Sequence, residues 1–437
     1  MGETMPNAIS RRSLLAATVA APLARPAIAQ NKPEKLVFVG DNGPWHYCLV
    51  EEVGPAFEKE TGIKVDFTLL PIDPLNARLH AELTAASGGI DVIQWSPIWA
   101  GWMAPYMEDH AQLIAKSTNP WSQDFDFSDF LPATKDLASY EGKLLGIPYR
   151  ATMDILHYQK ALLTEAGIAH PPENFAEFLA AAEALTKSGA PNRYGFGIMG
   201  RQGPAMVGNF TPFLFSNGGT HFDPKTMEIS INDAKAVEAL EFYGDLVTKY
   251  KVVPQDALTW EFDEIVANGQ NDRYAMTVTL APYGTLINDP KLSKTGGRWA
   301  WSPMMGAKTK EQGRTWLAGW VFGVPTACRN KEWAFQFVQM ATSKKWLRRS
   351  MDRGNAPTRA SALRDPSAIE FVGWAPAAAT ALETARIDPN HPIWPTLEAQ
   401  LRSGISQVLL GQKAAKPALD AVAADWQRSL RRANLIK

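Results

Sequence analysis

The chain has few of the residues that bind metals or carry out redox chemistry. Its 437 residues include 2 cysteines, Cys48 and Cys328, and 7 scattered histidines. One disulfide in an oxidising compartment and two buried free thiols explain the cysteines equally well. No cluster of metal ligands emerges from the spacing, so we expect neither a metal nor a cofactor.

Familiar catalytic motifs are also missing. The sequence contains no H-E-x-x-H, no P-loop and no G-x-S-x-G, so zinc peptidases, P-loop enzymes and α/β-hydrolases lack their signatures. The segment "GFGIMG" (195–200) fits the dinucleotide pattern. However, Pro204 interrupts the residues that follow and no acidic residue stands about 20 positions later, so we predict a glycine-rich strand or turn. Carboxylates are plentiful, which keeps a secreted carbohydrate-active enzyme as the alternative from another class.

Strong net charge and long apolar runs are absent as well. The chain has 44 basic and 45 acidic residues, a formal net charge of −1, which gives no broad basic surface for nucleic acid. The apolar stretch 14–24 is shorter than the ~20 residues that span a bilayer. It follows Arg11 and Arg12 and precedes a small-x-small end at Ala29, so we interpret residues 1–29 as an export signal. The twin arginines favour the twin-arginine route over the Sec route. The mature protein is expected to be soluble and periplasmic.

The remaining chain alternates between strand and helix patterns, and its length predicts two domains. Short apolar runs rich in β-branched residues predict strands at 35–40, 64–70 and 90–95, and strand character within 274–284 and 317–325. Helical spacing of apolar residues predicts helices at 49–62, 76–89, 174–189 and 233–250, and one long helix over 331–351. The β-α-β order at the start predicts a parallel sheet covered by helices.

Several segments, in this order and spacing, resemble extracellular solute-binding proteins of family 1, the sugar-binding, maltose-binding-protein-like components of ABC importers. The segments are "FEKETGIKV", "DVIQW", "YEGKLLGIPYRATMDILHYQKALLTEAG", "FLFSNGG", "YAMTV", "LAGWVFGVP", "NKEWAFQFVQMATS" and "GNAPTR". The resemblance implies the two-lobed α/β periplasmic-binding-protein fold of type II. Each lobe would have a mostly parallel sheet flanked by helices, with the ligand in the cleft between the lobes and hinge-bending closure. The implied lobes are 30–148 plus 320–350, and 149–319 plus 351–437.

Tryptophan is the abundant residue, with 15 in the chain. A sugar has an apolar face and a rim of hydroxyls, so its site needs flat rings together with polar side chains. Trp95 ends a predicted parallel strand, where such sheets bind ligands, whereas Trp99 and Trp102 follow at helical spacing and favour core packing. With the positions implied by the resemblance, the predicted ligand-binding residues are Asp41, Trp45, His46, Trp95, Arg150, Asn209, Tyr283, Gly319, Trp320, Arg359 and Trp394.

Alternatives stay open for several of these residues. Many relatives have an acidic residue just after the "IPY" segment, where this chain has Thr152, so their usual hydroxyl acceptor is in doubt. Arg150 suits an acidic sugar or a phosphorylated polyol, but equally an ion pair with Asp154 or another carboxylate. Helix capping or bracing of the lobes explains Arg359 nearly as well as binding does. Tyr283 and Trp320 suit the interior as well as the cleft.

The resemblance implies a non-catalytic, monomeric receptor that captures a mono- or oligosaccharide and delivers it to an ABC transporter permease. A polyol phosphate, a glycerophosphodiester or a polyamine is the alternative ligand within the same fold. Nucleic acid and stable membrane insertion are not expected.

Overall fold

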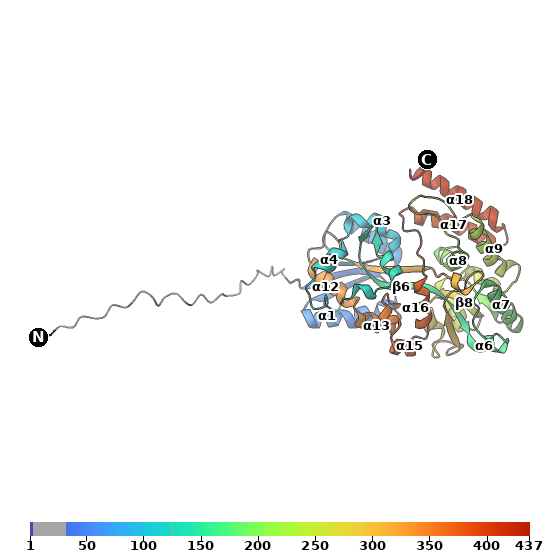
Figure 1. The fold of residues 1–437 in the computed structure, drawn as a ribbon, viewed down its shortest axis with the longest axis horizontal. Coiled ribbons are helices and arrows are strands. Elements are labelled where there is room, and N and C mark those ends of the chain that lie inside the picture. Colours follow the sequence, from blue (N-terminus) through green and yellow to red (C-terminus); the bar gives the residue numbers. More distant parts are fainter. Residues whose placement is uncertain (3–31, 124) are drawn as a thin grey trace. The chain divides into compact units, whose positions relative to one another are not determined.

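Residues 1–2, 32–123 and 125–437 are described by the computed structural model (Figure 1). The predicted export signal therefore lies outside the described residues, apart from Met1 and Gly2. Residues Pro33–Lys437 fold as one unit, which contains all the elements discussed below. Among the described helices, none has the length and apolar character needed to cross a membrane.

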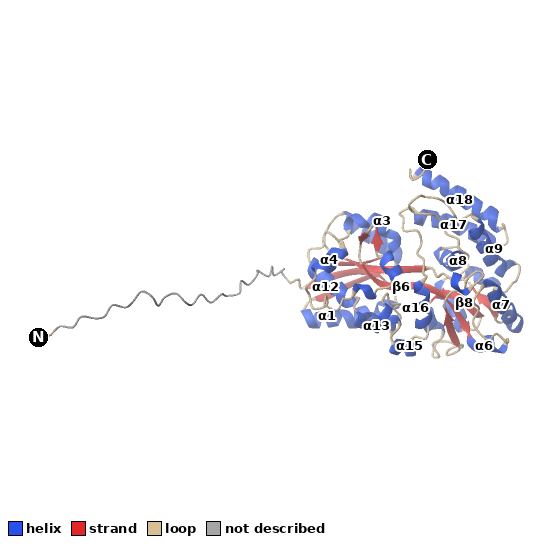
Figure 2. Cartoon of the chain, in the orientation of Figure 1, coloured by secondary structure: helices blue, strands red, loops and turns tan. Residues whose placement is uncertain are grey.

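Strands form one continuous hydrogen-bonded path in the order β2-β1-β3-β10-β6-β8-β7, with β9 also paired to β6. Figure 2 shows the strands in red, with helices around them. A short hairpin, β4 with β5, stands apart from it. The strands are β1 (Lys35–Asp41), β2 (Lys64–Leu70), β3 (Val92–Trp95), β4 (Ser139–Tyr140), β5 (Lys143–Leu144), β6 (Ile147–Gln159), β7 (Tyr194–Gly197), β8 (Tyr274–Leu280), β9 (Trp299–Ser302) and β10 (Leu317–Gly323). All five strands predicted from sequence are confirmed, and "GFGIMG" begins as strand β7.

The strands β1, β2 and β3 pair in parallel, as their β-α-β order predicts. Strand β1 is buried from Phe38 to Asp41, which places the carboxyl end of the strand in the interior. Since β2 and β3 end alongside β1, the loops that follow β1 and β3 leave the sheet at the same edge. This edge is where ligand sites form in open α/β sheets.

Two strands, β6 and β10, connect the parallel strands β1, β2 and β3 with the strands β7, β8 and β9 in the other half of the unit. Strand β6 pairs with β10 through residues 147–153 and with β8 and β9 through residues 154–159. Both β6 and β10 run antiparallel to their neighbours, because each crosses between the two halves of the unit. The sheets are therefore mixed, whereas the resemblance implied mostly parallel sheets. Parallel pairing holds for β1 with β2 and β3, and for β7 with β8.

Helices cover the sheets on both sides. They are α1 (Gly54–Thr61), α2 (Ile72–Thr84), α3 (Ala100–Met103), α4 (His110–Lys116), α5 (Pro132–Leu137), α6 (Lys160–Glu165), α7 (Phe175–Gly189), α8 (Pro204–Ser216), α9 (Ala234–Thr248), α10 (Phe262–Gln270), α11 (Tyr283–Ile287), α12 (Lys331–Ala341), α13 (Lys344–Met351), α14 (Ala360–Leu363), α15 (Pro366–Phe371), α16 (Ala375–Glu383), α17 (Trp394–Leu409) and α18 (Ala415–Arg432). The helix predicted at 49–62 consists of a π-helical turn, Leu49–Val53, followed by α1.

The single helix predicted over 331–351 is wrong, because the chain forms α12 and α13 with a break between them. Thr342 ends α12, and its hydroxyl donates to the Val338 carbonyl. Ser343 then caps α13 by accepting from the backbone N–H of Trp346. Serine competes for backbone hydrogen bonds in this way, which favours caps over helix interiors. The apolar periodicity continues across the break and concealed it.

Separate hydrophobic cores lie on the two halves of the unit. One core packs α7, α8, α9, α17 and α18 against β7 and β8. Two others lie on the two faces of β1 and β3, one with α12 and one with α2 and α3. A further core packs α14 and α16 against the middle of β6. The cores agree with a two-lobed molecule, while the residue bounds proposed for the lobes stay a prediction.

Candidate functional site

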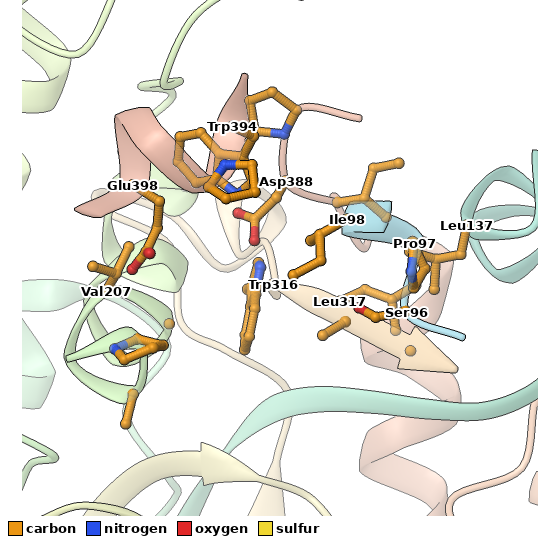
Figure 3. A pocket seen from close by; sticks show the side chains of 18 of the residues that line it. Ser96, Pro97, Ile98, Leu137, Val207, Trp316, Leu317, Asp388, Trp394 and Glu398 are labelled. Atoms are coloured by element: carbon orange, nitrogen blue, oxygen red, sulfur yellow. The ribbon is translucent and has the colours of Figure 1, made fainter. Parts of the chain in front are cut away.

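A pocket of about 300 Å³ opens where the two lobes meet (Figure 3). The first lobe contributes Ser96, Pro97 and Ile98, which directly follow β3. The second lobe contributes the first turns of α8 and α17. The floor comes from β10, including Gly319 and Trp320. The pocket is thus built at the carboxyl end of β3 and closed by elements from both lobes.

Three indole rings line the pocket. Trp320 lies on β10, Trp316 directly precedes that strand, and Trp394 begins α17. Trp394 is 2% exposed, because its other side packs on His221 with ring centroids 4.6 Å apart. A Cβ at Gly208 would lie 3.0 Å from the Trp316 ring, so the glycine in α8 leaves room for that indole. The rings supply the flat apolar surface that a sugar or polyol chain requires.

Polar side chains stand among these rings. Glu398 and Arg402 line the pocket from α17 and form an ion pair with each other. Asp388, in the segment before α17, points its carboxyl group between Trp394 and Trp316 (Figure 3). Burial raises the pKa of Asp388 to about 7. The indole N–H groups of Trp316 and Trp394 oppose this rise in part, and the negative charge of Glu398 adds to it. The pocket therefore combines an apolar surface with hydrogen-bonding groups, as small polar ligands require.

A buried polar cluster adjoins Trp320 at the end of β1. Arg150 donates from Nη2 to Oδ2 of Asp41 at 2.9 Å, and His46 Nε2 lies 2.6 Å from Oδ1 of the same carboxylate. Burial raises the pKa of Asp41, but the charge of Arg150 and the hydrogen bond with His46 outweigh it, so the pKa lies below its ordinary value. Burial also lowers the pKa of His46, and Asp41 offsets this only in part.

Arg150 also stacks between two indoles. Its guanidinium carbon lies 4.1 Å from the Trp45 ring centroid and 5.2 Å from that of Trp320. The ion-pair alternative for Arg150 is thus present in the structure, with Asp41 as the partner and not Asp154. Arg150 Nε and Nη1 are buried and have no hydrogen-bond partner within the described part of the chain.

The predicted site residues therefore fall into four groups. Gly319, Trp320 and Trp394 line the pocket. Asp41, His46 and Arg150 of the buried polar cluster do not line it, and neither does Trp45, which stacks on Arg150. Tyr283 begins α11 and packs near Phe262, a pocket residue, at 6.5 Å between ring centroids.

Trp95, Asn209 and Arg359 are fully buried, and none of them lines the pocket. Trp95 ends β3 with its ring in the core that contains Trp99, because all four residues of this short strand are buried. Asn209 donates to the Val278 carbonyl and accepts from the backbone of Met199, so its amide holds α8 on the sheet. The structure assigns these two side chains to packing and hydrogen bonding within the protein, rather than to a ligand surface.

Arg359 braces neighbouring elements, the alternative that the sequence left open. It donates to the carbonyls of Thr342 and Asp126, each at 2.7 Å, and to the Asp129 carboxylate at 3.3 Å. Its guanidinium also lies 3.9 Å from the Phe130 ring centroid. These contacts hold the chain before α14 against the loop before α5.

Sequence reasoning missed Trp316, Asp388 and Glu398. Trp316 lies four residues before Trp320, and Asp388 opens the irregular "DPNHPIWP" segment that also holds Trp394. Proximity to those two predicted residues was the available signal. In the residues that the structure describes, no three potential metal ligands are grouped closely enough to hold an ion. Cys48 and Cys328 are both buried and free.

Comparisons with known proteins identify the family that the chain matches. The sequence profile described as bacterial extracellular solute-binding protein matches residues 49–347. The mannitol-binding protein of Pseudomonas aeruginosa is 25% identical, with 97% of this chain and 99% of that protein aligned. The erythritol/L-threitol-binding protein of Mycolicibacterium smegmatis is 26% identical over 68% of this chain and 64% of that protein. Both relatives are described as binding proteins, not as enzymes.

Solved structures show the same fold. An ABC transporter solute-binding protein from Agrobacterium radiobacter, in complex with ribitol, superposes with a TM-score of 0.77 at 22% identity, covering 90% of this chain and 98% of that one. Another from Agrobacterium vitis, with bound D-mannitol, gives 0.75 at 20% identity, covering 92% and 99%. The predicted two-lobed α/β fold class is confirmed by these likenesses.

Proposed function

This chain belongs to the family of bacterial extracellular solute-binding proteins, and on this premise we propose that it captures a neutral polyol or monosaccharide and delivers it to an ABC transporter permease. The observation that carries the proposal is the pocket between the lobes. Trp316, Trp320 and Trp394 are among its lining residues, with Trp316 the least buried of the three indoles, and Asp388 and Glu398 present hydrogen-bond acceptors. Flat apolar rings with a few oriented polar groups match the alternating C–H and O–H surface of a polyhydroxy compound.

The size of the pocket favours a single sugar or alditol over a long oligosaccharide. Its volume of about 300 Å³ is at the lower end of the range for small-molecule sites, ~300–1,000 Å³. The relatives named for mannitol and for erythritol/L-threitol support an alditol of this size.

A neutral ligand is favoured because Arg402, the arginine that lines the pocket, already has a carboxylate partner. Arg402 is paired with Glu398, and Arg150, close to Trp320, is paired with Asp41. An acidic sugar or a polyol phosphate would bring negative charge towards Asp388 and Glu398 without an unpaired cation among the described residues that line the pocket. We therefore favour neutral ligands over the acidic ones.

A calorimetric titration series tests the proposal. The ligands are D-mannitol, ribitol, erythritol, D-glucose, maltose, D-gluconate and spermidine. We expect saturable one-to-one binding of at least one alditol or monosaccharide. Trp316→Ala should weaken that binding by ~10- to 100-fold, since loss of ring contact area costs ~1.5–3 kcal/mol. Trp333→Ala, a partly buried indole on α12 outside the pocket, is the matched control. Absence of binding by every alditol and sugar would refute the proposed function.

We further propose that the protein is a non-catalytic periplasmic receptor. The pocket carboxylates Asp388 and Glu398 make the carbohydrate-active enzyme the rival to test. Incubation with oligosaccharides should leave them intact, whereas product formation lost in Asp388→Asn would favour the enzyme. Cell fractionation should recover the chain in the periplasm, and a paired Arg11→Lys and Arg12→Lys variant should accumulate in the cytoplasm if export uses the twin-arginine route.

A further inference from the structure

Resting on the proposed function, we infer that Asp388 and Trp316 together form a subsite for one ligand hydroxyl. In this subsite the Trp316 indole N–H donates a hydrogen bond to the hydroxyl oxygen, and the ionised Asp388 carboxylate accepts a hydrogen bond from the hydroxyl O–H.

The donor and the acceptor are both present and point toward each other. Trp316 Nε1 and Asp388 Oδ1 are buried, and neither makes a well-formed hydrogen bond with a described residue, although the Trp316 N–H lies close enough to the carboxyl group to lower its pKa in part. The indole nitrogen of Trp316 points toward the carboxyl group of Asp388 (Figure 3). A buried polar group left unpaired costs about 1–3 kcal/mol, so a ligand that satisfies both groups gains affinity from each.

A hydroxyl is the ligand group that satisfies both at once. It has one O–H donor and two acceptor lone pairs, so the same oxygen serves the indole and the carboxylate. An ammonium group only donates and would leave the Trp316 N–H unpaired. A carboxylate or a fully ionised phosphate only accepts and would face Asp388 with like charge. The subsite therefore selects neutral polyhydroxy ligands over polyamines and over acidic sugars.

Titration of Asp388 should make ligand capture depend on pH. Its pKa, raised to about 7 by burial and by Glu398, means that the carboxyl loses its charge as the pH falls through neutrality. The charged groups that line the pocket with it are Glu398 and Arg402 on α17, which pair with each other. His391 lies three residues along the same segment, and burial lowers its pKa. Since a charged acceptor makes a hydrogen bond about twice as strong as a neutral one, the ionised form should bind more tightly.

Calorimetry with D-mannitol at pH 8 and pH 6 tests the inference, with ribitol titrated in parallel. If only the form with ionised Asp388 binds the ligand, the wild-type affinity should fall about tenfold between pH 8 and pH 6. Asp388→Asn should weaken binding at pH 8 by about tenfold and reduce the pH effect to less than twofold. Trp316→Phe keeps a ring but removes the N–H, and should weaken binding by about fivefold. Asp73→Asn, an exposed carboxylate on α2, is the control that should change neither value.

A double-mutant cycle separates this subsite from two independent contacts. Because both groups would hold the same ligand oxygen, the effects of Asp388→Asn and Trp316→Phe should be less than additive. Full additivity would overturn the shared subsite. Wild-type binding that strengthens towards pH 6, or a pH effect that persists in Asp388→Asn and so belongs to His391 or Glu398, would also overturn it. Failure of the wild type to bind any alditol or sugar at pH 8 would instead refute the proposed function.

Discussion

Acid should destabilise this protein through its buried neutral histidines, and His110 gives the clearest case. Its side chain is completely buried next to Phe335. Nδ1 lies 3.0 Å from the Glu108 carbonyl and must carry the proton, while Nε2 accepts from the backbone N–H of Val324 at 3.0 Å. Protonation of Nε2 would remove this acceptor and place a second N–H against the N–H of Val324. Burial accordingly lowers the pKa of His110 to about 4.

The sign and size of the effect follow from this shift. The unfolded chain takes up a proton at His110 near pH 6.5 and the folded chain only near pH 4, so stability is lost as the pH falls below 6.5. Between pH 7.5 and pH 5 the loss from His110 is about 2 kcal/mol. His157 and His221 have pKa values lowered to about 3 by burial and act in the same direction. Asp388 acts in the opposite direction, because its raised pKa makes the folded form bind the proton first.

Comparison of variants isolates the His110 contribution from these opposing ones. His110→Gln keeps one donor and one acceptor but cannot titrate. Urea unfolding of the ligand-free protein at pH 7.5 and pH 5 should show a smaller acid-induced loss of free energy for this variant, by about 2 kcal/mol, whatever its stability at pH 7.5. His170→Gln, on an exposed histidine, should match the wild type. A difference between His110→Gln and wild type below about 0.5 kcal/mol would refute a buried neutral His110.

Three further predictions concern the bracing role of Arg359, the redox state of the two cysteines and the charge of the ligand. Arg359→Met should lower stability by ~3–5 kcal/mol, because it leaves Asp129 without its buried partner, and should leave ligand affinity unchanged in calorimetry. Cys48 and Cys328 should react with a thiol reagent only after unfolding, and a reductant should not shift the melting temperature, since both are free and burial raises the pKa of Cys48 to about 12. A mannitol phosphate should bind at least tenfold more weakly than D-mannitol, because the charge of Arg150 is already neutralised by Asp41 and cannot receive the phosphate. Equal affinities for the two ligands would contradict this reasoning.

The fold was largely predictable because its strands and helices have periodic local patterns. The strand run 35–40 and the helix run 174–189 carry their structure in the spacing of their own apolar residues. The break at Ser343 was hidden because the apolar spacing continues through it, and only the side-chain cap ends the helix. Local pattern thus determines which elements form, while capping determines their limits.

The site was less predictable because its pairs are made between distant positions. Asp41 and Arg150 are 109 residues apart, and no local pattern distinguishes that pairing from one with Asp154. Trp95 ends a strand at the expected edge, yet the pleat turns its ring into the core. Trp394 lies between Pro392 and Pro395 in the sequence, yet it begins a helix. Whether a ring faces ligand or interior depends on how the lobes pack, which one strand or helix does not specify.

The crossing strands explain how a ligand at this site would favour closure. Trp320 on β10 is paired in register with Arg150 on β6, so one pocket ring and one residue of the buried polar cluster lie on the two strands that join the lobes. A Cβ at Gly319 would lie 2.8 Å from the Arg150 carbonyl, which shows how closely the strands approach there. A ligand shifts the open-closed equilibrium only through contacts that differ between the two states. Ser96 reaches the pocket from one lobe and Trp394 from the other, so their simultaneous contact with ligand would supply that difference.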